Sequence, residues 1–213
     1  LGKTNTPELT LSFDTDNLIY GPTKNPFDLK RSPGGSSGGA AAAISANCTP
    51  FDIGSDFGGS IRLPAHYCGI TGIKPTSGRV PRTGHIYPFG GYLDHLQQLG
   101  PMSRRVHDLY PILRIIAGPD KQDPAIIPMP LVDPSSVRIK DVRVGFYTNN
   151  GVASPTLETV QTIEQAAFSL QNTAREVSEF SPSSSHLLSE LCPAIYSSDG
   201  GAASRRLLRT YGT

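Results

Sequence analysis

Two glycine-rich segments that each carry serine constrain this chain more than any other feature. The first covers residues 34–39 (Gly-Gly-Ser-Ser-Gly-Gly), and the second covers residues 56–62 (Asp-Phe-Gly-Gly-Ser-Ile-Arg). Glycine lacks a Cβ atom, so it tolerates positive φ and lets other groups approach the backbone closely. The pattern therefore predicts two tight loops that present hydroxyl groups, Ser36 in the first loop and Ser60 in the second.

The residues around the two loops predict regular structure. The alanines of residues 40–43 favour a helix directly after the first loop. Free N–H groups at the start of that helix would suit developing negative charge. Residues 49–54 are expected to form a short buried strand, after which residues 55–60 turn away. The amides of residues 57–60 would then converge on one oxygen, as in an oxyanion hole.

Other interpretations of these loops are weaker. Gly-Ser stretches are often flexible linkers, but here a helix and a strand are predicted beside them. A phosphate-binding P-loop needs Gly-Lys followed by Ser or Thr, whereas Ala40 follows Gly39. His66 lies six residues after Ser60, yet the segment lacks the Gly-x-Ser-x-Gly elbow of Ser-His-Asp hydrolases. We expect the histidines to be surface or hydrogen-bonded residues and expect no metal ligand among them.

The loops also belong to a longer ordered set of motifs that resembles the amidase signature family. The motifs are residues 32–39, 56–62 and 68–76, with further matches at residues 2–8, 20–27, 99–104 and 198–201. The match is most similar to the fatty acid amide hydrolase branch of the family. This resemblance implies an α/β class, the amidase signature fold, in which helices flank a mixed β-sheet core. It also implies hydrolysis of carboxylic amides of the fatty-acyl type, with no cofactor and no metal.

The family uses a Ser–cis-Ser–Lys triad, and the resemblance places two of its members in this chain. Ser60 matches the nucleophile, which would attack the carbonyl and form an acyl-enzyme. Ser36 matches the bridging serine, whose peptide bond with Gly35 would be cis and whose hydroxyl would lie within hydrogen-bond reach of Ser60. The remaining roles are the oxyanion hole, at Phe57, Gly58, Gly59 and Ser60, and support of the site, by Ser37, Asp56 and Arg62.

No lysine of this chain matches the third member of the triad. In the family that lysine lies well upstream of the first loop, before the position of residue 1, so we expect the chain to be a piece truncated at both ends. A general base must come within hydrogen-bond distance of the hydroxyl network. We expect Lys3, Lys24 and Lys74 to be structural or solvent-facing instead.

Length and composition set broader limits. A chain of 213 residues predicts one domain, residues 1–213, that can bury a core. Its 19 basic and 18 acidic residues include no basic block, which argues against a nucleic-acid partner. Cys48, Cys68 and Cys192 fit neither a disulfide framework nor a zinc site, so we expect buried, reduced thiols in a cytoplasmic protein. No apolar run approaches the roughly 18 residues of a membrane span; a homodimer, and membrane association through other segments, stay open.

A helix is predicted in the middle of the chain, after a long segment of irregular structure. Glycine and proline indicate loops over residues 76–101. Ser103 would cap a helix that runs to about Ala117, and Gly118 would end it. Pro111 inside this helix would kink it or mark a later start.

The C-terminal half alternates between strand and helix patterns. Residues 142–147 have the alternation of a strand. A helix would start at Ser154-Pro155, with proline at the first helical position. Its predicted apolar face is Leu157, Val160, Ile163, Ala167 and Leu170. The alternation favours the α/β class.

Three functions fit these observations. The first is a serine hydrolase that cleaves small-molecule amides. The second is an A-type subunit of a glutamine-dependent amidotransferase, which passes ammonia to the substrate of a partner protein. The third is a non-catalytic binding module that kept the loops but lost the base. Assays with glutamine and with acyl amides would separate the first two functions.

Overall fold

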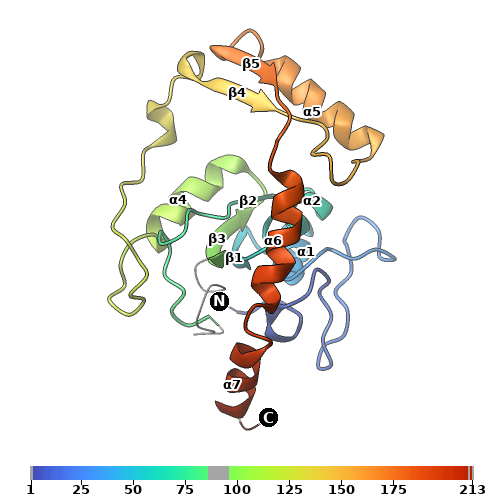
Figure 1. The fold of residues 1–213 in the computed structure, drawn as a ribbon, viewed down its shortest axis with the longest axis vertical. Coiled ribbons are helices and arrows are strands. Elements are labelled where there is room, and N and C mark those ends of the chain that lie inside the picture. Colours follow the sequence, from blue (N-terminus) through green and yellow to red (C-terminus); the bar gives the residue numbers. More distant parts are fainter. Residues whose placement is uncertain (1, 86–95, 211, 213) are drawn as a thin grey trace. The chain divides into compact units, whose positions relative to one another are not determined.

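The structure of the protein is a computed structural model that describes residues 2–85, 96–210 and 212 (Figure 1). Contacts within the chain divide it into two compact units. Unit 1 comprises Leu1–Leu131 and Ala202–Thr213, and unit 2 comprises Val132–Gly201. Such a division does not distinguish two domains from two parts of one domain, so the single domain over residues 1–213 stays a prediction.

Unit 1 is built on a three-stranded antiparallel sheet in the order β1-β3-β2. Its strands are β1 (Phe51–Asp56), β2 (Thr71–Gly72) and β3 (Gln98–Ser103). The register places Phe51 opposite Ser103 and Asp56 opposite Gln98, so β1 ends where β3 begins. The second glycine-rich loop leaves the sheet after Asp56, and the end of a paired strand therefore positions it.

The central strand β3 begins inside the segment that glycine and proline predicted as loops. Its Pro101 has no N–H group, which normally excludes proline from a central strand. Here the Pro101 carbonyl accepts a hydrogen bond from the Ile73 N–H at 3.1 Å, on the side where β2 pairs over two residues only. The missing donor faces Ile73, just past the end of β2, and the ladder with β1 is kept. Gly100 is required because a Cβ atom there would lie 1.9 Å from the Ile73 carbonyl oxygen.

Unit 1 also contains helices, several of which contact this sheet. Those within the described residues are α1 (Gly38–Ser45), α2 (Arg62–Tyr67), α4 (Val106–Ile116) and α7 (Ala202–Thr210), with a 3-10 turn at Glu8–Thr10. Helix α1 packs against β1 and β3, and α4 packs against β3 and β2. The core cluster is Ala40, Ala41, Ile44, Ile61, Cys68 and Met102. The small alanines let the α1 backbone come close to the sheet, which brings the first glycine-rich loop beside β1.

The helix predicted after residue 103 forms as α4, but it begins later. Ser103 is instead the last residue of β3, where its hydroxyl donates to the Arg105 carbonyl at 2.8 Å. Pro111 lies within α4 without ending it. Gly118 follows the helix with a φ of 105°, as expected of a residue that ends it.

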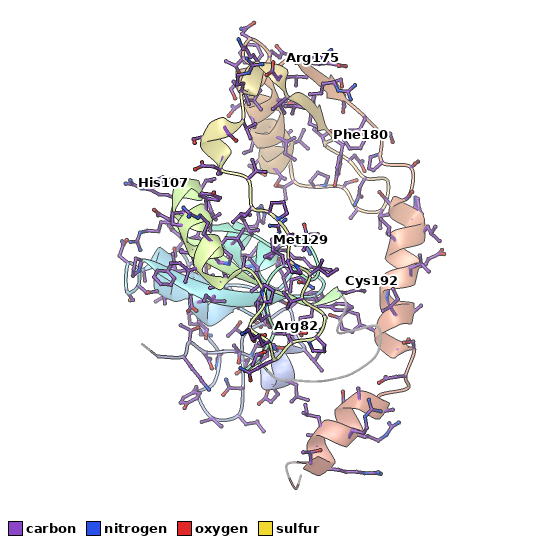
Figure 2. All side chains as sticks on the ribbon, turned by 90° about the vertical axis from the view of Figure 1, so that its left-hand side faces the viewer. Arg82, His107, Met129, Arg175, Phe180 and Cys192 are labelled. Carbon is purple, nitrogen blue, oxygen red and sulfur yellow. The ribbon has the colours of Figure 1, made fainter. Side chains whose placement is uncertain are left out.

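A buried ion pair fastens the proline-rich segment that follows α4. Arg82, labelled in Figure 2, has its Nε atom 3.2 Å from Asp123 Oδ2, and both side chains are largely buried. The Ile127 N–H also donates to the Gly78 carbonyl at 2.9 Å. These contacts keep residues 119–131 with unit 1, although they form no helix or strand.

Unit 2 contains a β-α-β motif. Strands β4 (Arg143–Phe146) and β5 (Glu176–Glu179) pair in parallel, and helix α5 (Leu157–Leu170) connects them. The strand predicted at residues 142–147 is confirmed as β4. The unit also contains helix α6 (Ser185–Ser197) and 3-10 turns at Pro134–Ser136 and Ile139–Asp141.

Helix α5 starts later than predicted from Ser154-Pro155. Its N-cap is Thr156, whose hydroxyl accepts a hydrogen bond from the Thr159 N–H at 3.4 Å, so Pro155 precedes the helix rather than opening it. Of the predicted apolar face only Ala167 is buried, and Leu157 at one end of that face is 67% exposed.

The parallel and antiparallel strand pairs, packed with helices, confirm the α/β class. In the part of the chain that the structure describes, no helix has both the length and the apolar character to cross a bilayer. Over the same residues no cluster of His, Cys, Asp and Glu side chains is suited to a metal ion. All three cysteines are unpaired, but only Cys68 is buried. The expectation of three buried thiols is wrong for Cys48 and for Cys192, which lies on α6 (Figure 2).

Candidate active site

The second glycine-rich loop is wrapped around one buried carboxylate. Asp56 is fully buried and accepts hydrogen bonds from three loop amides: Gly59 at 2.9 Å, Ile61 at 3.1 Å and Arg62 at 3.2 Å. The Arg62 guanidinium adds two more, from Nε at 3.0 Å and from Nη2 at 2.9 Å. These donors fix the path of the loop, and the role of Asp56 and Arg62 as supporting residues of a catalytic site stays a prediction.

The Asp56 carboxylate stays ionised in this position. Burial by itself raises its pKa, but the hydrogen bonds from Arg62 and from the Ile61 amide outweigh burial and hold the pKa below its ordinary value. Lys74 is a second cation nearby, with Nζ 3.7 Å from Asp56 Oδ1. The Asp56 carboxylate therefore lies near both the Arg62 guanidinium and the Lys74 ammonium group.

The first glycine-rich loop is fastened by a residue of the N-terminal segment. Thr15 is fully buried, and its hydroxyl donates to the Gly34 carbonyl at 2.8 Å and accepts from the Gly38 amide at 3.0 Å. The Gly35–Ser36 peptide bond is cis, as the resemblance implied. Sequence analysis missed Thr15, because a lone threonine in a polar segment has no motif that marks it.

The N-terminus of α1 does not offer free amides at its first two positions, contrary to the prediction. The Gly38 N–H donates to Thr15, and the Gly39 N–H donates to the Asn5 carbonyl at 3.2 Å. The two backbones are so close that a Cβ atom at Gly39 would lie 2.4 Å from the Asn5 carbonyl oxygen. These N–H groups hold the N-terminal segment in place, so a developing charge must be stabilised elsewhere.

Ser37 connects the two loops. Its amide donates to the Ser60 carbonyl at 3.1 Å. Its hydroxyl donates to the Ser55 carbonyl at 3.4 Å and accepts from the Ser55 amide at 3.3 Å. Gly54 makes room for this hydroxyl, since a Cβ atom there would lie 2.7 Å from it. These bonds are the kind that a supporting residue would make.

Ser36 precedes Ser37 in the first loop, and Ser60 is the residue of the second loop whose carbonyl accepts from the Ser37 amide. Only 1% of Ser36 and 8% of Ser60 is exposed. Among the described residues neither hydroxyl forms a hydrogen bond, so the expected contact between them is not made in this structure. Their assignment as bridging serine and nucleophile stays a prediction.

Two amides of the second loop are available as donors. Across residues 2–85, 96–210 and 212, no acceptor pairs with the N–H of Gly58 or of Ser60. The Gly59 N–H differs, because it donates to Asp56. The predicted convergence of all four amides on one oxygen is therefore not observed: Gly59 stabilises the loop instead. The oxyanion role of Phe57 stays a prediction.

The lysines take the places expected of structural or surface residues. Lys74 Nζ donates to the Phe57 carbonyl at 2.5 Å, and 23% of its side chain is exposed. Lys3 and Lys24 are exposed. His66 is exposed on α2. Among the other histidines, His95 lies outside the described residues.

Comparison with known sequences covers almost the whole chain. The family model for amidases matches residues 1–211. The A-type subunit of the glutamyl-tRNA(Gln) amidotransferase from Macrococcus caseolyticus (strain JCSC5402) is 42% identical over 184 residues, which cover 84% of this chain and 37% of the relative. The chain therefore spans well under half the length of this curated relative.

Two solved structures share the fold. A bacterial aryl acylamidase of the amidase signature family has a TM-score of 0.82 and 32% identity, covering 100% of this chain and 44% of its own. A fatty acid amide hydrolase has a TM-score of 0.83 and 30% identity, covering 97% of this chain and 37% of its own. The two serine-bearing loops and these matches lead to one conclusion: the chain belongs to the amidase signature family.

Proposed function

We propose that the complete protein hydrolyses carboxylic amides with Ser60 as its nucleophile. The arrangement around Ser60 carries the proposal: a buried hydroxyl in a loop fixed by Asp56, beside the available amides of Gly58 and Ser60. A serine nucleophile needs an activating group and a site for the oxyanion. In this proposal the loop supplies the oxyanion site, and Ser36 of the neighbouring loop passes on the proton through a contact with Ser60 that this structure does not itself make.

The reaction proceeds in two halves. Ser60 Oγ forms a bond to the substrate carbonyl carbon while its proton passes to the Ser36 hydroxyl, which gives its own proton to a base. The Gly58 and Ser60 amides stabilise the oxyanion. The C–N bond then breaks, the leaving nitrogen takes up the proton, and an acyl-enzyme remains on Ser60. Water attacks the acyl carbonyl in the same manner, releasing the acid and restoring the Ser60 hydroxyl.

The base completes this scheme. The resemblance assigns it to a lysine that none of Lys3, Lys24 and Lys74 matches, and Lys74 is already engaged with Phe57 and Asp56. A lysine accepts a proton only when neutral, which burial and nearby cations bring about by lowering its pKa.

For the substrate we favour glutamine over a fatty-acyl amide. The relative with 42% identity belongs to an amidotransferase, whereas the fatty acid amide hydrolase is 30% identical. We therefore propose an A-type subunit that releases ammonia from glutamine for the substrate of a partner protein. Its three unpaired cysteines fit a cytoplasmic location.

A stand-alone acyl amidase is the second candidate. It is supported by the TM-score of 0.83 with the fatty acid amide hydrolase over 97% of this chain. The two candidates use the same loops and differ in the amide that enters. Substrate competition on the complete protein therefore distinguishes them.

The decisive experiment measures ammonia release from glutamine and hydrolysis of acyl amides by the complete protein. We expect glutamine to be the better substrate. Ser60→Ala should reduce turnover at least about 1,000-fold, while Ser169→Ala, an exposed serine of α5, should leave it unchanged. A fluorophosphonate adduct mapped by mass spectrometry should lie on Ser60. Labelling at another serine contradicts the assignment, and no turnover with no labelling indicates the binding module.

A further inference from the structure

Lys74 is the cation of the site that the proposed mechanism leaves without a role. Its Nζ donates to the Phe57 carbonyl oxygen at 2.5 Å and lies 3.7 Å from Asp56 Oδ1. The backbone before it is fixed, since the Ile73 amide donates to the Pro101 carbonyl of the central strand at 3.1 Å. Lys74 therefore reaches the second loop from a firmly held part of unit 1.

The Phe57 carbonyl and the Gly58 N–H belong to one peptide unit. This unit is trans, and in a planar trans peptide the two groups point in opposite directions. An ammonium group that holds the carbonyl oxygen on one side therefore directs the N–H to the other side, away from Lys74. Because the Gly58 amide is one of the two available oxyanion donors, the orientation of this unit decides where that donor points.

The local sequence does not fix that orientation. Gly58 is exposed, and Gly59 has a φ of 134°, so side-chain sterics place few limits on the backbone here. Asp56 anchors the loop from Gly59 onwards. The Phe57–Gly58 peptide lies before those anchors, and Lys74 holds its oxygen.

We propose that Lys74 is a positioning residue that aims the Gly58 amide at the oxyanion formed when Ser60 attacks the substrate. The proposal rests on the function proposed above. Lys74 acts through the peptide unit and does not touch the substrate. The oxyanion exists in the transition state and not in the bound substrate, so loss of Lys74 slows turnover without weakening substrate binding.

The experiment compares Lys74→Met with Lys24→Met, an exposed lysine of the same unit, in the complete protein. Removing an oxyanion donor costs about 100- to 1,000-fold in kcat, and misdirecting one should cost about 10- to 100-fold. We expect that loss in Lys74→Met with KM changed less than about twofold, and no change in Lys24→Met. Affinity for a trifluoromethyl ketone substrate analogue, whose serine adduct is an oxyanion, should fall in parallel with kcat/KM.

Lys74→Arg supplies the rescue. It keeps a charged donor within reach of the Phe57 carbonyl and should recover most of kcat, and Lys74→Gln, with a neutral donor, should lie between Arg and Met. Unchanged kcat in the folded Met or Gln variant overturns the proposal. A loss above about 10,000-fold that Arg does not recover also overturns it, because it indicates a base. Absent turnover and absent Ser60 labelling in the unsubstituted protein overturn the proposed function itself.

Discussion

Unit 1 and unit 2 use similar elements but bury very different amounts of apolar surface. In unit 1 the side chains of Ile44, Ile61 and Met102 are fully buried. In unit 2, Ala167 is the one buried hydrophobic residue among the described residues, and Phe168 beside it is 71% exposed. A two-stranded parallel sheet with a single helix leaves one face uncovered, so the β-α-β motif buries little.

This difference shows where a rigid site can be built. Both glycine-rich loops lie in unit 1, where a core, a central strand and a buried carboxylate hold backbone that has few side chains of its own. A substitution affects stability according to what the side chain buries and contacts. Matched substitutions in the two units should therefore differ in their effects, and three pairs of substitutions and one pair of cysteines test the comparison.

The largest difference is expected between two aspartates. Asp56→Asn should cost about 3 kcal/mol of unfolding free energy at pH 7, at the low end for a broken buried pair because the Arg62 side chain is 56% exposed. Asp141→Asn, in the exposed pair with Arg138, should cost at most about 1 kcal/mol. Urea denaturation measures both values.

The Asp56 effect should also depend on pH. The pKa of Asp56 is lowered in the folded protein, so its stabilising contribution is present above the ordinary value of 3.8 and is lost as the pH falls through the folded pKa. The difference in unfolding free energy between Asp56→Asn and the unsubstituted chain should decrease as the pH is lowered from 5 toward 2. A gap that stays constant over this range would show that the carboxylate charge does not stabilise the loop.

Two hydrophobic truncations should differ in their effect on unfolding free energy by slightly less than the two aspartate variants do. Ile44→Ala removes a fully buried side chain from the core of unit 1 and should cost at least about 2 kcal/mol. Phe168→Ala removes a mostly exposed ring from unit 2 and should change stability by less than about 0.5 kcal/mol. Equal losses in thermal or urea unfolding would mean that unit 2 has a core comparable to that of unit 1.

The labelling rates of the cysteines provide another comparison of the two units. Burial raises the pKa of the Cys68 thiol to about 11, so very little thiolate is present at pH 8. Cys192 is exposed in unit 2. A disulfide reagent at pH 8 should label Cys192 at least about 100-fold faster than Cys68, with exposed Cys48 as the control from unit 1. Comparable rates for Cys68 and Cys192 would contradict the burial of Cys68.

The smallest difference is expected between two strand glycines. Gly100→Ala places a Cβ atom 1.9 Å from the Ile73 carbonyl oxygen, and since backbone cannot swing aside, it should cost about 1–3 kcal/mol. In β4, Gly145→Ala meets the Phe180 ring at 3.1 Å. Phe180 is 48% exposed and can move, so we expect a change below about 0.5 kcal/mol. Equal destabilisation by the two variants would show that unit 2 is as tightly packed as unit 1.

Local signals predicted much of this fold. The alanines of residues 40–43 predicted α1, and the alternation of apolar and other residues over 142–147 predicted β4. The main missed element was β3, because Gly100 and Pro101 are breakers in isolation. They suit a central strand here because the Ile73 carbonyl comes too close to Gly100 for a side chain, and the Ile73 N–H donates to the Pro101 carbonyl. Ile73 lies just after β2, outside the segment that contains Gly100 and Pro101, so no pattern within that segment reveals it.

The sequence by itself determined the two glycine-rich loops, their serines and the helix that follows the first loop, since glycine and alanine act through local sterics. Only the tertiary structure decided what those loops contact. Thr15 accepts a hydrogen bond from the first amide of α1, Asp56 accepts one from the Gly59 amide, and Lys74 donates one to the Phe57 carbonyl. The first and last of these contacts join residues far apart in the sequence, and they form only after the core has brought their segments together, because an unfolded chain loses entropy to close each such loop.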